Sequence, residues 1–489
     1  MSNLEKKNDS DSPDVEALER PDVSERVDKM TERKLLSKLD KRIVPVIMWM
    51  YLMNFMDRVA IGNARLYGLE ADLGLDGEQF QIAVSVLFIT YCMFEVPSNL
   101  IIKRMQPARY LGGLAIGWGL VATFSAFVQN FAGLVACRLL LGFFEAGMFP
   151  GIILYLSMFY NRNSIALRSA YFFSVAAISG AVGGFVSYAI GFLDGRHGWL
   201  AWRWVLLING IPSIVTGLVI PFVLPNSVET SKFLSDEEKR QLYVLRHTEV
   251  GQTVSGQQLH KADIMKAVKD WTTYGYAFCG FCQNIMLYSF STFLPTIILD
   301  IGSWTRPEVQ ALTIPIYSLG AIAFLIMARI GDITGKRAII IIPFNFIAII
   351  GYILLLSNAG TGASFTGCFF IGIGVYTAGG MALTWLTSNC PRYGKRAFSS
   401  GFQLTMANAA GVPAPFIFAN STAPRFIQGY STTIAALCCS NLMFLTLALY
   451  WRRRNKRRDA GLEDYKMEGK TEEEIMEMGD ESPRFRYMY

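Results

Sequence analysis

Long apolar runs follow one another along almost the whole chain. Twelve stretches of about twenty residues are apolar enough to cross roughly 30 Å of bilayer hydrocarbon as helices. They begin near Ile43, Phe80, Tyr110, Phe131, Ser169, Trp202, Tyr274, Val309, Ala338, Phe365, Phe398 and Tyr430. Because backbone polar groups in hydrocarbon must bond within their own segment, these runs predict an all-α polytopic membrane protein with 12 transmembrane helices.

The composition agrees with a membrane protein and excludes several other classes. Of 489 residues, 52% are hydrophobic and only 17% are charged, whereas a soluble domain of this size is more polar. The net charge of +6 does not indicate nucleic acid, because Lys and Arg fall in short gaps between apolar runs. Most of the eight cysteines lie inside apolar runs, so no disulfide framework is expected, and three histidines make a metal cluster implausible. We therefore predict neither a metal nor a cofactor.

One long polar connection divides the chain into two halves. We expect a disordered cytosolic tail over 1–42, a six-helix bundle over 43–224, a central cytoplasmic loop over 225–273, a second six-helix bundle over 274–451 and a cytosolic C-terminal tail over 452–489. Within the loop, Ser235 followed by Glu238 has the spacing of a capping box, which predicts the start of a surface helix.

Charges in the short loops predict the orientation of the chain. The loops that follow even-numbered apolar runs carry most of the Lys and Arg, and a basic run follows the last apolar segment. Because such residues are retained on the cytoplasmic side, both termini are expected to be cytoplasmic. In the fifth run, Gly180 and Gly184 have the small-xxx-small spacing that lets helices approach closely. Asn420-Ser-Thr422 fits a glycosylation sequon close to the eleventh run.

Four charged residues lie deep inside the apolar runs of the first half. Asp57 and Arg58 are in the first run, and Arg138 and Glu145 are in the fourth. A charge at bilayer depth costs roughly 2.5 to 3.5 kcal/mol even on a lenient scale, so such residues face the protein interior and usually have a function. At 1.5 Å per helical residue, Asp57, Arg58 and Arg138 all lie roughly 10 Å below the outer boundary and are expected to meet. Glu145, two turns after Arg138, lies about 10 Å deeper on the same face.

These four residues suggest transport of an anion. The donors of an Arg guanidinium match the two oxygens of a substrate carboxylate. The two acids can carry protons, and their protonation can switch with whether Arg138 contacts Asp57. The alternative is that the four residues form static ion pairs that hold helices in register. We prefer the functional interpretation because buried ion pairs seldom add net stability.

The second half has almost no buried charge but offers polar and aromatic side chains. Gln283, Asn284, Tyr288, Trp385 and Asn408 are candidates for contacts with the rest of the ligand. For any one of them, a hydrogen bond between helices is the alternative. In the first half, Glu95 is expected to pair with a basic neighbour such as Lys103 or Arg104 rather than to bind substrate.

Several motifs resemble those of the major facilitator superfamily. Gly331-Asp332 and Gly335-Lys336-Arg337, between the eighth and ninth runs, are similar to its characteristic loop. Asp57-Arg58-Val-Ala-Ile-Gly-Asn63 and Arg138-Leu-Leu-Leu-Gly-Phe-Phe-Glu145 resemble its anion:cation symporter branch. Together with the terminal Phe485-Arg-Tyr-Met-Tyr489, they are most similar to the fungal allantoate permease group, which includes nicotinic acid permeases.

The resemblance implies roles for several of these residues. Arg58 would bind the carboxylate, Asp57 and Glu145 would take protons, and Arg138 would couple them, while the two halves rock about a central site. The implied gating loop consists of Gly331, Asp332, Gly335, Lys336 and Arg337. One departure is Asn209, which stands where many relatives have a Glu.

The expected function is proton-coupled symport, without enzymatic activity. The expected substrate is a small organic carboxylate imported across a fungal plasma membrane, with nicotinate as the first guess. The partners are this anion, protons and the lipid bilayer, without nucleic acid, and the protein is expected to be a monomer. Two alternatives are an exporter of an acidic secondary metabolite and a non-transporting nutrient receptor.

Overall fold

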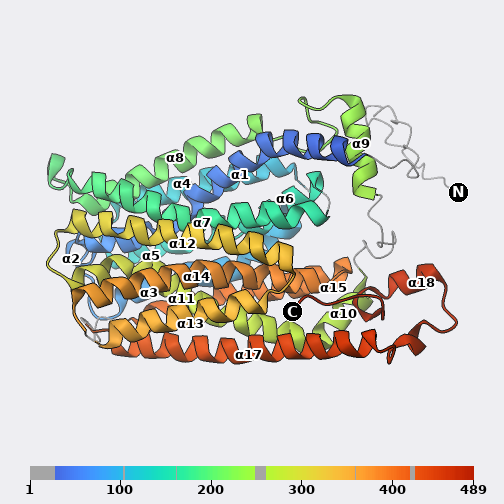
Figure 1. The fold of residues 1–489 in the computed structure, drawn as a ribbon. Coiled ribbons are helices and arrows are strands. Elements are labelled where there is room, and N and C mark those ends of the chain that lie inside the picture. Colours follow the sequence, from blue (N-terminus) through green and yellow to red (C-terminus); the bar gives the residue numbers. More distant parts are fainter. Residues whose placement is uncertain (1–27, 103–104, 161, 248–259, 358, 419–424) are drawn as a thin grey trace, which may run out of the picture.

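The computed structural model describes residues 28–102, 105–160, 162–247, 260–357, 359–418 and 425–489. Within these ranges it is helical, with no β-strand. Figure 1 shows the long helices side by side along one axis, with α9, α10 and α18 at one end of the bundle and α2 at the other. We call the first of these the termini end, because α1 begins there and the C-terminal tail packs there, and the second the far end.

Eleven segments among the described residues are long and apolar enough to cross a membrane. They are α1 (Lys29–Leu66), α3 (Gln79–Ile102), α4 (Pro107–Phe124), the pair α5 (Phe131–Glu145) and α6 (Met148–Phe159), α7 (Arg162–Gly191), α8 (Ala201–Val223), α11 (Trp271–Ile301), α12 (Arg306–Thr334), α13 (Ala338–Ser357), α14 (Thr361–Asn389) and α17 (Ile427–Asp459). The all-helical membrane fold is thus confirmed.

The expected span near Phe398 has a different form. It is divided between α15 (Tyr393–Ala409) and the short α16 (Ala414–Ile417). Pro413 and Pro415 lack the N–H that would continue the α15 ladder, so the helix ends before them. A twelfth continuous span therefore remains a prediction, as does the cytoplasmic position of the termini. The sequon at Asn420 lies outside the described residues.

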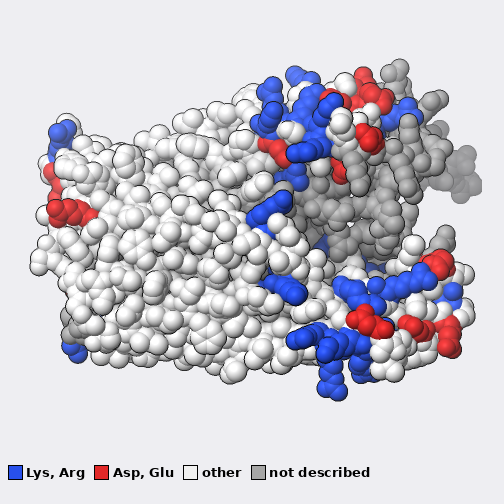
Figure 2. Space-filling model, viewed as in Figure 1, with Lys and Arg blue, Asp and Glu red and all other residues white. Residues whose placement is uncertain are grey.

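Charge is distributed unevenly along the bundle. Figure 2 shows Lys and Arg gathered at the termini end, whereas the broad middle of the visible face consists of uncharged residues. Such an uncharged belt suits contact with lipid, and the excess of cations at one end is the pattern from which the orientation was predicted.

The helices up to α8 form one half of the bundle, and those from α11 onward form the other. Figure 1 shows the two halves one above the other, with α7 and α12 adjacent where they meet. Two further pairs, α1 with α11 and α3 with α15, also join the halves. The site described below lies between these paired helices.

Glycines allow the halves to pack closely toward the far end. A Cβ at Gly180 would lie 2.7 Å from the ring of Tyr317 in α12, and one at Gly184 would overlap Thr313. The predicted close approach at these two glycines is therefore confirmed. In α1, a Cβ at Gly62 would overlap the backbone carbonyl oxygen of Thr292 in α11.

Replacing Gly62 with alanine is expected to lower transport about tenfold, because overpacking costs about 1 to 3 kcal/mol and the α11 backbone must move. Gly113→Ala is the matched control, since a Cβ there meets nothing within 4 Å. Initial uptake rates, normalised to protein at the cell surface, provide the measurement. Equal rates for the two variants would mean that the contact between Gly62 and Thr292 is not needed for transport.

The first helix begins within the segment that was expected to be a disordered tail. Asp28 caps α1 by accepting a hydrogen bond from the backbone N–H of Met30 (3.1 Å), and Leu35 and Leu39 are buried. Asp40 also pairs with Arg168 of α7 (2.6 Å). The prediction over 1–42 is therefore corrected for the residues from Lys29 onward, because buried leucines and this ion pair fix them to the bundle.

The expected surface helix in the central connection is confirmed as α9 (Asp236–His247). The Ser235 backbone N–H donates to the Glu238 carboxylate (2.8 Å), and the Glu238 N–H donates to the Ser235 hydroxyl (3.2 Å). Glu238 also binds Lys38 of α1 (2.7 Å), so α9 is tied to the first half. A second helix of the connection, α10 (Lys261–Lys269), packs against α15 of the second half.

The C-terminal tail is ordered and packs against the termini end of the second half. It contains the short helix α18 (Glu472–Glu477) and ends in an extended strap. The Tyr487 ring stacks on Trp451 of α17 (centroids 3.9 Å apart). Asn389 of α14 exchanges two hydrogen bonds with the backbone of Met488 (2.8 and 3.0 Å). Sequence alone did not predict this docking.

Ion pairs join the tail to the helix ends beneath it. Lys395 lies 2.7 Å from Asp480 and 2.6 Å from Asp270, and Lys266 lies 2.8 Å from Glu481. Burial would raise the pKa of Asp270, but the Lys395 ammonium holds that pKa below its ordinary value. A carboxylate with a lowered pKa stabilises the folded state above about pH 4, and this contribution is lost as the pH falls through the lowered pKa.

Replacing Tyr487 with alanine is expected to release the strap. Loss of about 2 kcal/mol of aromatic contact would raise the population of the undocked tail about 30-fold. Trypsin cleavage at Arg484 and Arg486 in purified protein, followed by mass spectrometry, measures this change. Tyr465→Ala is the control, because Tyr465 lies in the same tail but is 64% exposed. Equal cleavage rates in both variants would contradict the docking role of Tyr487.

Candidate functional site

Asp57 and Arg58 are neighbours on α1 but point to different partners. Consecutive residues on an α-helix are rotated by about 100°, so the two side chains cannot share one direction. The Arg58 guanidinium binds Glu145 of α5 through Nε (2.9 Å) and a terminal nitrogen (2.7 Å). The Glu145 side chain is fully buried, and that of Arg58 is 10% exposed. This pair lies close to where the two halves meet.

Glu145 is the last residue of α5 and lies at a break in the fourth span. The helix stops there and resumes at Met148 as α6. Pro150 cannot donate a hydrogen bond to the carbonyl four residues earlier, so the regular ladder is interrupted after Glu145. Only one Glu145 oxygen is used, because Oε1 is buried without a hydrogen-bond partner in the described part of the chain.

Asp57 and Arg138 do not form the contact that the helix depths suggested. The Ser213 hydroxyl of α8 donates to the Asp57 carboxylate (2.5 Å), and the other Asp57 oxygen is buried without a hydrogen bond of ordinary geometry to a described residue. Arg138 lies close enough to interact electrostatically with both Glu145 and Asp57. Its Nε nevertheless makes no hydrogen bond to any described residue. The structure therefore replaces the expected pairing of Arg138 with Asp57 by the pair of Arg58 with Glu145.

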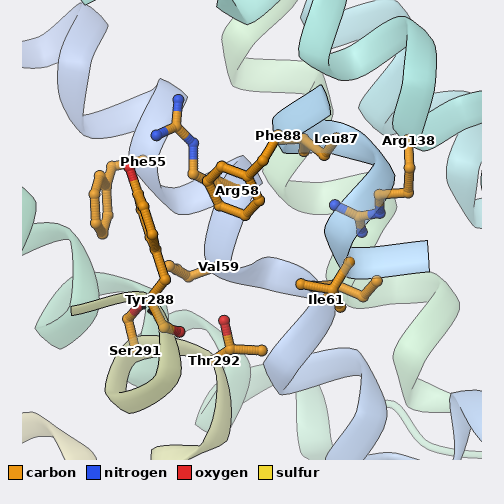
Figure 3. Close-up of a pocket in the computed structure, with 11 residues that line it drawn as sticks. Phe55, Arg58, Val59, Ile61, Leu87, Phe88, Arg138, Tyr288, Ser291 and Thr292 are labelled. Atoms are coloured by element: carbon orange, nitrogen blue, oxygen red, sulfur yellow. Dashed lines mark hydrogen bonds between the residues drawn. The ribbon is translucent and has the colours of Figure 1, made fainter. Parts of the chain in front are cut away.

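Two cavities lie between the halves, one on each side of Arg58. The far cavity, drawn in Figure 3, is lined by Phe55, Arg58, Val59, Ile61, Val84, Leu87, Phe88, Arg138, Tyr288, Ser291 and Thr292. The near cavity, toward the termini end, is lined by Tyr51, Phe55, Arg58, Tyr91, Phe149, Ala176, Asn284, Leu287, Tyr288, Leu383, Leu404 and Asn408. Phe55, Arg58 and Tyr288 line both. A guanidinium, an aromatic ring and a phenol thus form the boundary between the two spaces.

Three of the candidates from the second half line the near cavity. These are Asn284 and Tyr288 of α11 and Asn408 of α15. The Tyr288 hydroxyl donates to Asn408 Oδ1 (2.7 Å), which links α11 to α15. The structure therefore brings these three side chains to the same space as Arg58.

The other two candidates do not line either cavity. Gln283 donates to Asn345 (3.0 Å) and Ser440 (3.1 Å), which join helices within the second half. Trp385 is fully buried, and its Nε1 donates to the backbone carbonyl of Met488 in the tail (2.9 Å). For these two residues the structure supports the alternative of internal hydrogen bonding, because the Gln283 amide nitrogen and the Trp385 indole nitrogen already have partners away from the cavities.

Glu95 of α3 makes a hydrogen bond to the opposite half. It is 3% exposed, and its carboxylate accepts a hydrogen bond from Thr405 of α15 (3.3 Å). The side chains of Lys103 and Arg104 lie outside the described residues. The expected pairing of Glu95 with one of these residues therefore stays a prediction, but Thr405 lies one helical turn from Asn408, so Glu95 lies near the residues that line the near cavity.

The loop between α12 and α13 has the geometry of a helix stop. Gly335 adopts φ = 65°, which favours glycine, and its N–H donates to Gly331 O (3.0 Å). Arg337 is buried and donates to the Met381 sulfur of α14 (3.6 Å). The side chain of Asp332 lies outside the described residues. The gating role of the loop from Gly331 to Arg337, which includes Lys336, remains a prediction.

Sequence reasoning missed the aromatic walls of the near cavity. Tyr51, Phe55, Tyr91 and Phe149 contribute rings to it, beside the predicted Tyr288. A signal was present in α1, because Tyr51, Phe55 and Arg58 follow helical spacing and so share one face. The rings of α3 and α6 had no such local signal.

The fold and its site define a polytopic membrane transporter. The sequence matches the Major Facilitator Superfamily over residues 47–415, and the chain belongs to that family. It is therefore a multi-pass membrane transporter and not an enzyme.

Individual relatives support this assignment. The chain is 38% identical to an uncharacterized transporter of Schizosaccharomyces pombe, over 89% of this chain and 86% of that protein. It is 30% identical to the high-affinity nicotinic acid transporter of Saccharomyces cerevisiae, over 94% of this chain and 85% of that protein. A bacterial homologue of the human lysosomal transporter Spinster, solved inward-facing and unoccupied, shares the fold with a TM-score of 0.62 and 15% identity, covering 86% of this chain and 96% of that chain.

Proposed function

We propose that this protein is a proton-coupled symporter that imports a small organic carboxylate, with nicotinate as the first candidate. The observation that carries the proposal is the buried pair of Arg58 and Glu145 at the boundary between the two cavities. An unpaired guanidinium there would suit a carboxylate, because its donors match two carboxylate oxygens at once. The nicotinic acid transporter relative makes nicotinate the first substrate to test.

The ion pair offers a direct route to coupling. While Glu145 is ionised, it occupies both Nε and a terminal nitrogen of Arg58. A proton on Glu145 would remove the charge that holds the guanidinium, and Arg58 would then be free to bind the substrate carboxylate. Protonation and substrate binding would thus favour each other, which is the requirement for symport.

Asp57 and Arg138 form the second part of this proposed mechanism. Asp57 is the second proton acceptor, placed on the first-half side of α1 by its bond to Ser213. Arg138 would respond to the charge of both carboxylates, because it interacts with each and has an unused Nε. We place the termini end in the cytoplasm, the protein in the plasma membrane and the functional unit in a monomer.

The proposal is tested by the initial uptake of labelled nicotinate in yeast that lacks its own transporter. Uptake is measured at acidic and neutral pH, with and without a protonophore, and with unlabelled carboxylates as competitors. Uptake that is faster in acid and abolished by the protonophore would support proton-coupled import. A different outcome would favour export. In that case the protein reaches the surface and takes up none of the carboxylates, and the cells instead lose a preloaded acid.

A further inference from the structure

The near cavity contains a buried hydrogen-bond donor that the proposed mechanism does not use. Asn408 is 5% exposed, and its Nδ2 makes no hydrogen bond of ordinary geometry to a described residue, although it lies close enough to the Glu95 carboxylate to interact with it. Buried polar groups are nearly always paired, and an unpaired one is costly unless a ligand or water completes it. Asn408 also lines the cavity, so a bound molecule would lie beside this amide.

Neighbouring side chains fix the direction of this amide. The Tyr288 hydroxyl donates to Asn408 Oδ1 (2.7 Å), which occupies the acceptor and turns the NH₂ group away from Tyr288, with the Glu95 carboxylate as one acceptor nearby. Thr405, on the same face of α15, holds the Glu95 carboxylate (3.3 Å). Asn284, the other amide of the cavity, has no such bond to another described residue, so Asn408 is the better organised donor.

The two polar ends of the cavity belong to different halves. Arg58 is on α1 of the first half, and Asn408 is on α15 of the second half. The walls between them include the rings of Tyr51, Phe55 and Phe149. A flat ring fits aromatic walls, a carboxylate fits Arg58, and a hydrogen-bond acceptor on the ring fits the Asn408 amide.

We propose that Asn408 selects the substrate by donating a hydrogen bond to an acceptor atom on its ring, so that heteroaromatic carboxylates are preferred to carbocyclic ones. This inference rests on the proposed function, because Arg58 must hold the carboxylate. A substrate bound in this way contacts both halves at once. A ring without an acceptor would leave the Asn408 donor unpaired, which is how a polar site rejects a near-isosteric analogue.

The test compares four aromatic acids that differ only in the presence or position of a ring nitrogen. They are nicotinate, isonicotinate, picolinate and benzoate. Each competes against labelled nicotinate in cells that express wild-type protein, Asn408→Leu or Asn284→Leu, and surface protein is measured in parallel. For the wild type, we expect benzoate to be about tenfold weaker than the best pyridine acid. Asn408→Leu should bring this ratio to about one by weakening the pyridine acids while leaving benzoate unchanged.

Further variants separate recognition from structural damage. Asn284→Leu should keep the wild-type ratio, and Tyr288→Phe should reduce it partly, because the amide loses its orienting bond. If Asn408→Leu does not reach the surface, Asn408→Ser serves instead, since its short hydroxyl does not reach the same position. Continued competition by benzoate would show that the Arg58 end of the site is intact.

The outcomes distinguish this inference from the function on which it rests. A wild-type protein that imports nicotinate but accepts benzoate equally would overturn the role of Asn408 and leave carboxylate import standing. A ratio that changes in Asn284→Leu and not in the Asn408 variants would also overturn it. Surface-located wild-type protein that does not take up labelled nicotinate would refute nicotinate import and, with it, this inference.

Discussion

Replacing Arg58 with lysine is expected to lower carboxylate uptake about 10- to 100-fold although the positive charge is kept. Lysine cannot reproduce the two bonds that the guanidinium makes to Glu145, nor the fork that we propose for the substrate. Hydrogen bonds to charged groups contribute about 1.5 to 3 kcal/mol, and each 1.4 kcal/mol corresponds to a factor of ten. Initial uptake rates over a range of substrate concentrations measure the loss.

The control for this variant is Arg329→Lys, which makes the same exchange at an exposed position on α12. We expect it to transport at the wild-type rate. Wild-type uptake by Arg58→Lys, with surface levels equal to those of the control, would show that the carboxylate does not depend on the Arg58 fork.

Replacing Glu145 with glutamine is expected to abolish uphill accumulation while leaving exchange of substrate across the membrane. Glutamine cannot take or release a proton, so the proposed link between protonation and release of Arg58 is lost. Its amide oxygen can still accept one hydrogen bond, which preserves the packing around α5. The internal-to-external ratio of labelled substrate should fall to near one at acidic pH, whereas counterflow into preloaded cells should continue.

Glu78→Gln is the matched control, because Glu78 is exposed in the loop before α3. It should accumulate substrate as the wild type does. Accumulation against a gradient by the Glu145 variant would remove Glu145 from the proton path and leave the pair with Arg58 as a structural contact.

Features that depend only on residues close together in the chain could be predicted from the sequence. The bilayer requires about twenty apolar residues for each span, so length and composition locate most of them without any knowledge of packing. The capping box at Ser235 and the close approach at Gly180 and Gly184 likewise follow from local spacing. The run near Phe398 shows the limit, because Pro413 and Pro415 divide it into α15 and α16.

The partners of the buried charges could not be predicted in the same way. Depth along a helix indicated that Asp57 and Arg138 would be level, but depth does not give rotation about the helix axis. In the structure Asp57 faces Ser213, and Arg58 reaches Glu145 at the break before Met148. Pairing is decided by these rotations and breaks, which depend on how several helices pack together.

The sequence by itself determined that the chain is a membrane-spanning helical protein and that a few charged residues inside its spans required an explanation. The cost of burying apolar and charged groups is a property of each segment, so it is readable from composition and spacing. Only the tertiary structure decided that Tyr288 and Asn408 share a cavity with Arg58, whereas Trp385 supports the docked tail at Met488. These contacts join residues far apart in the chain, and their geometry arises only when the two halves pack together.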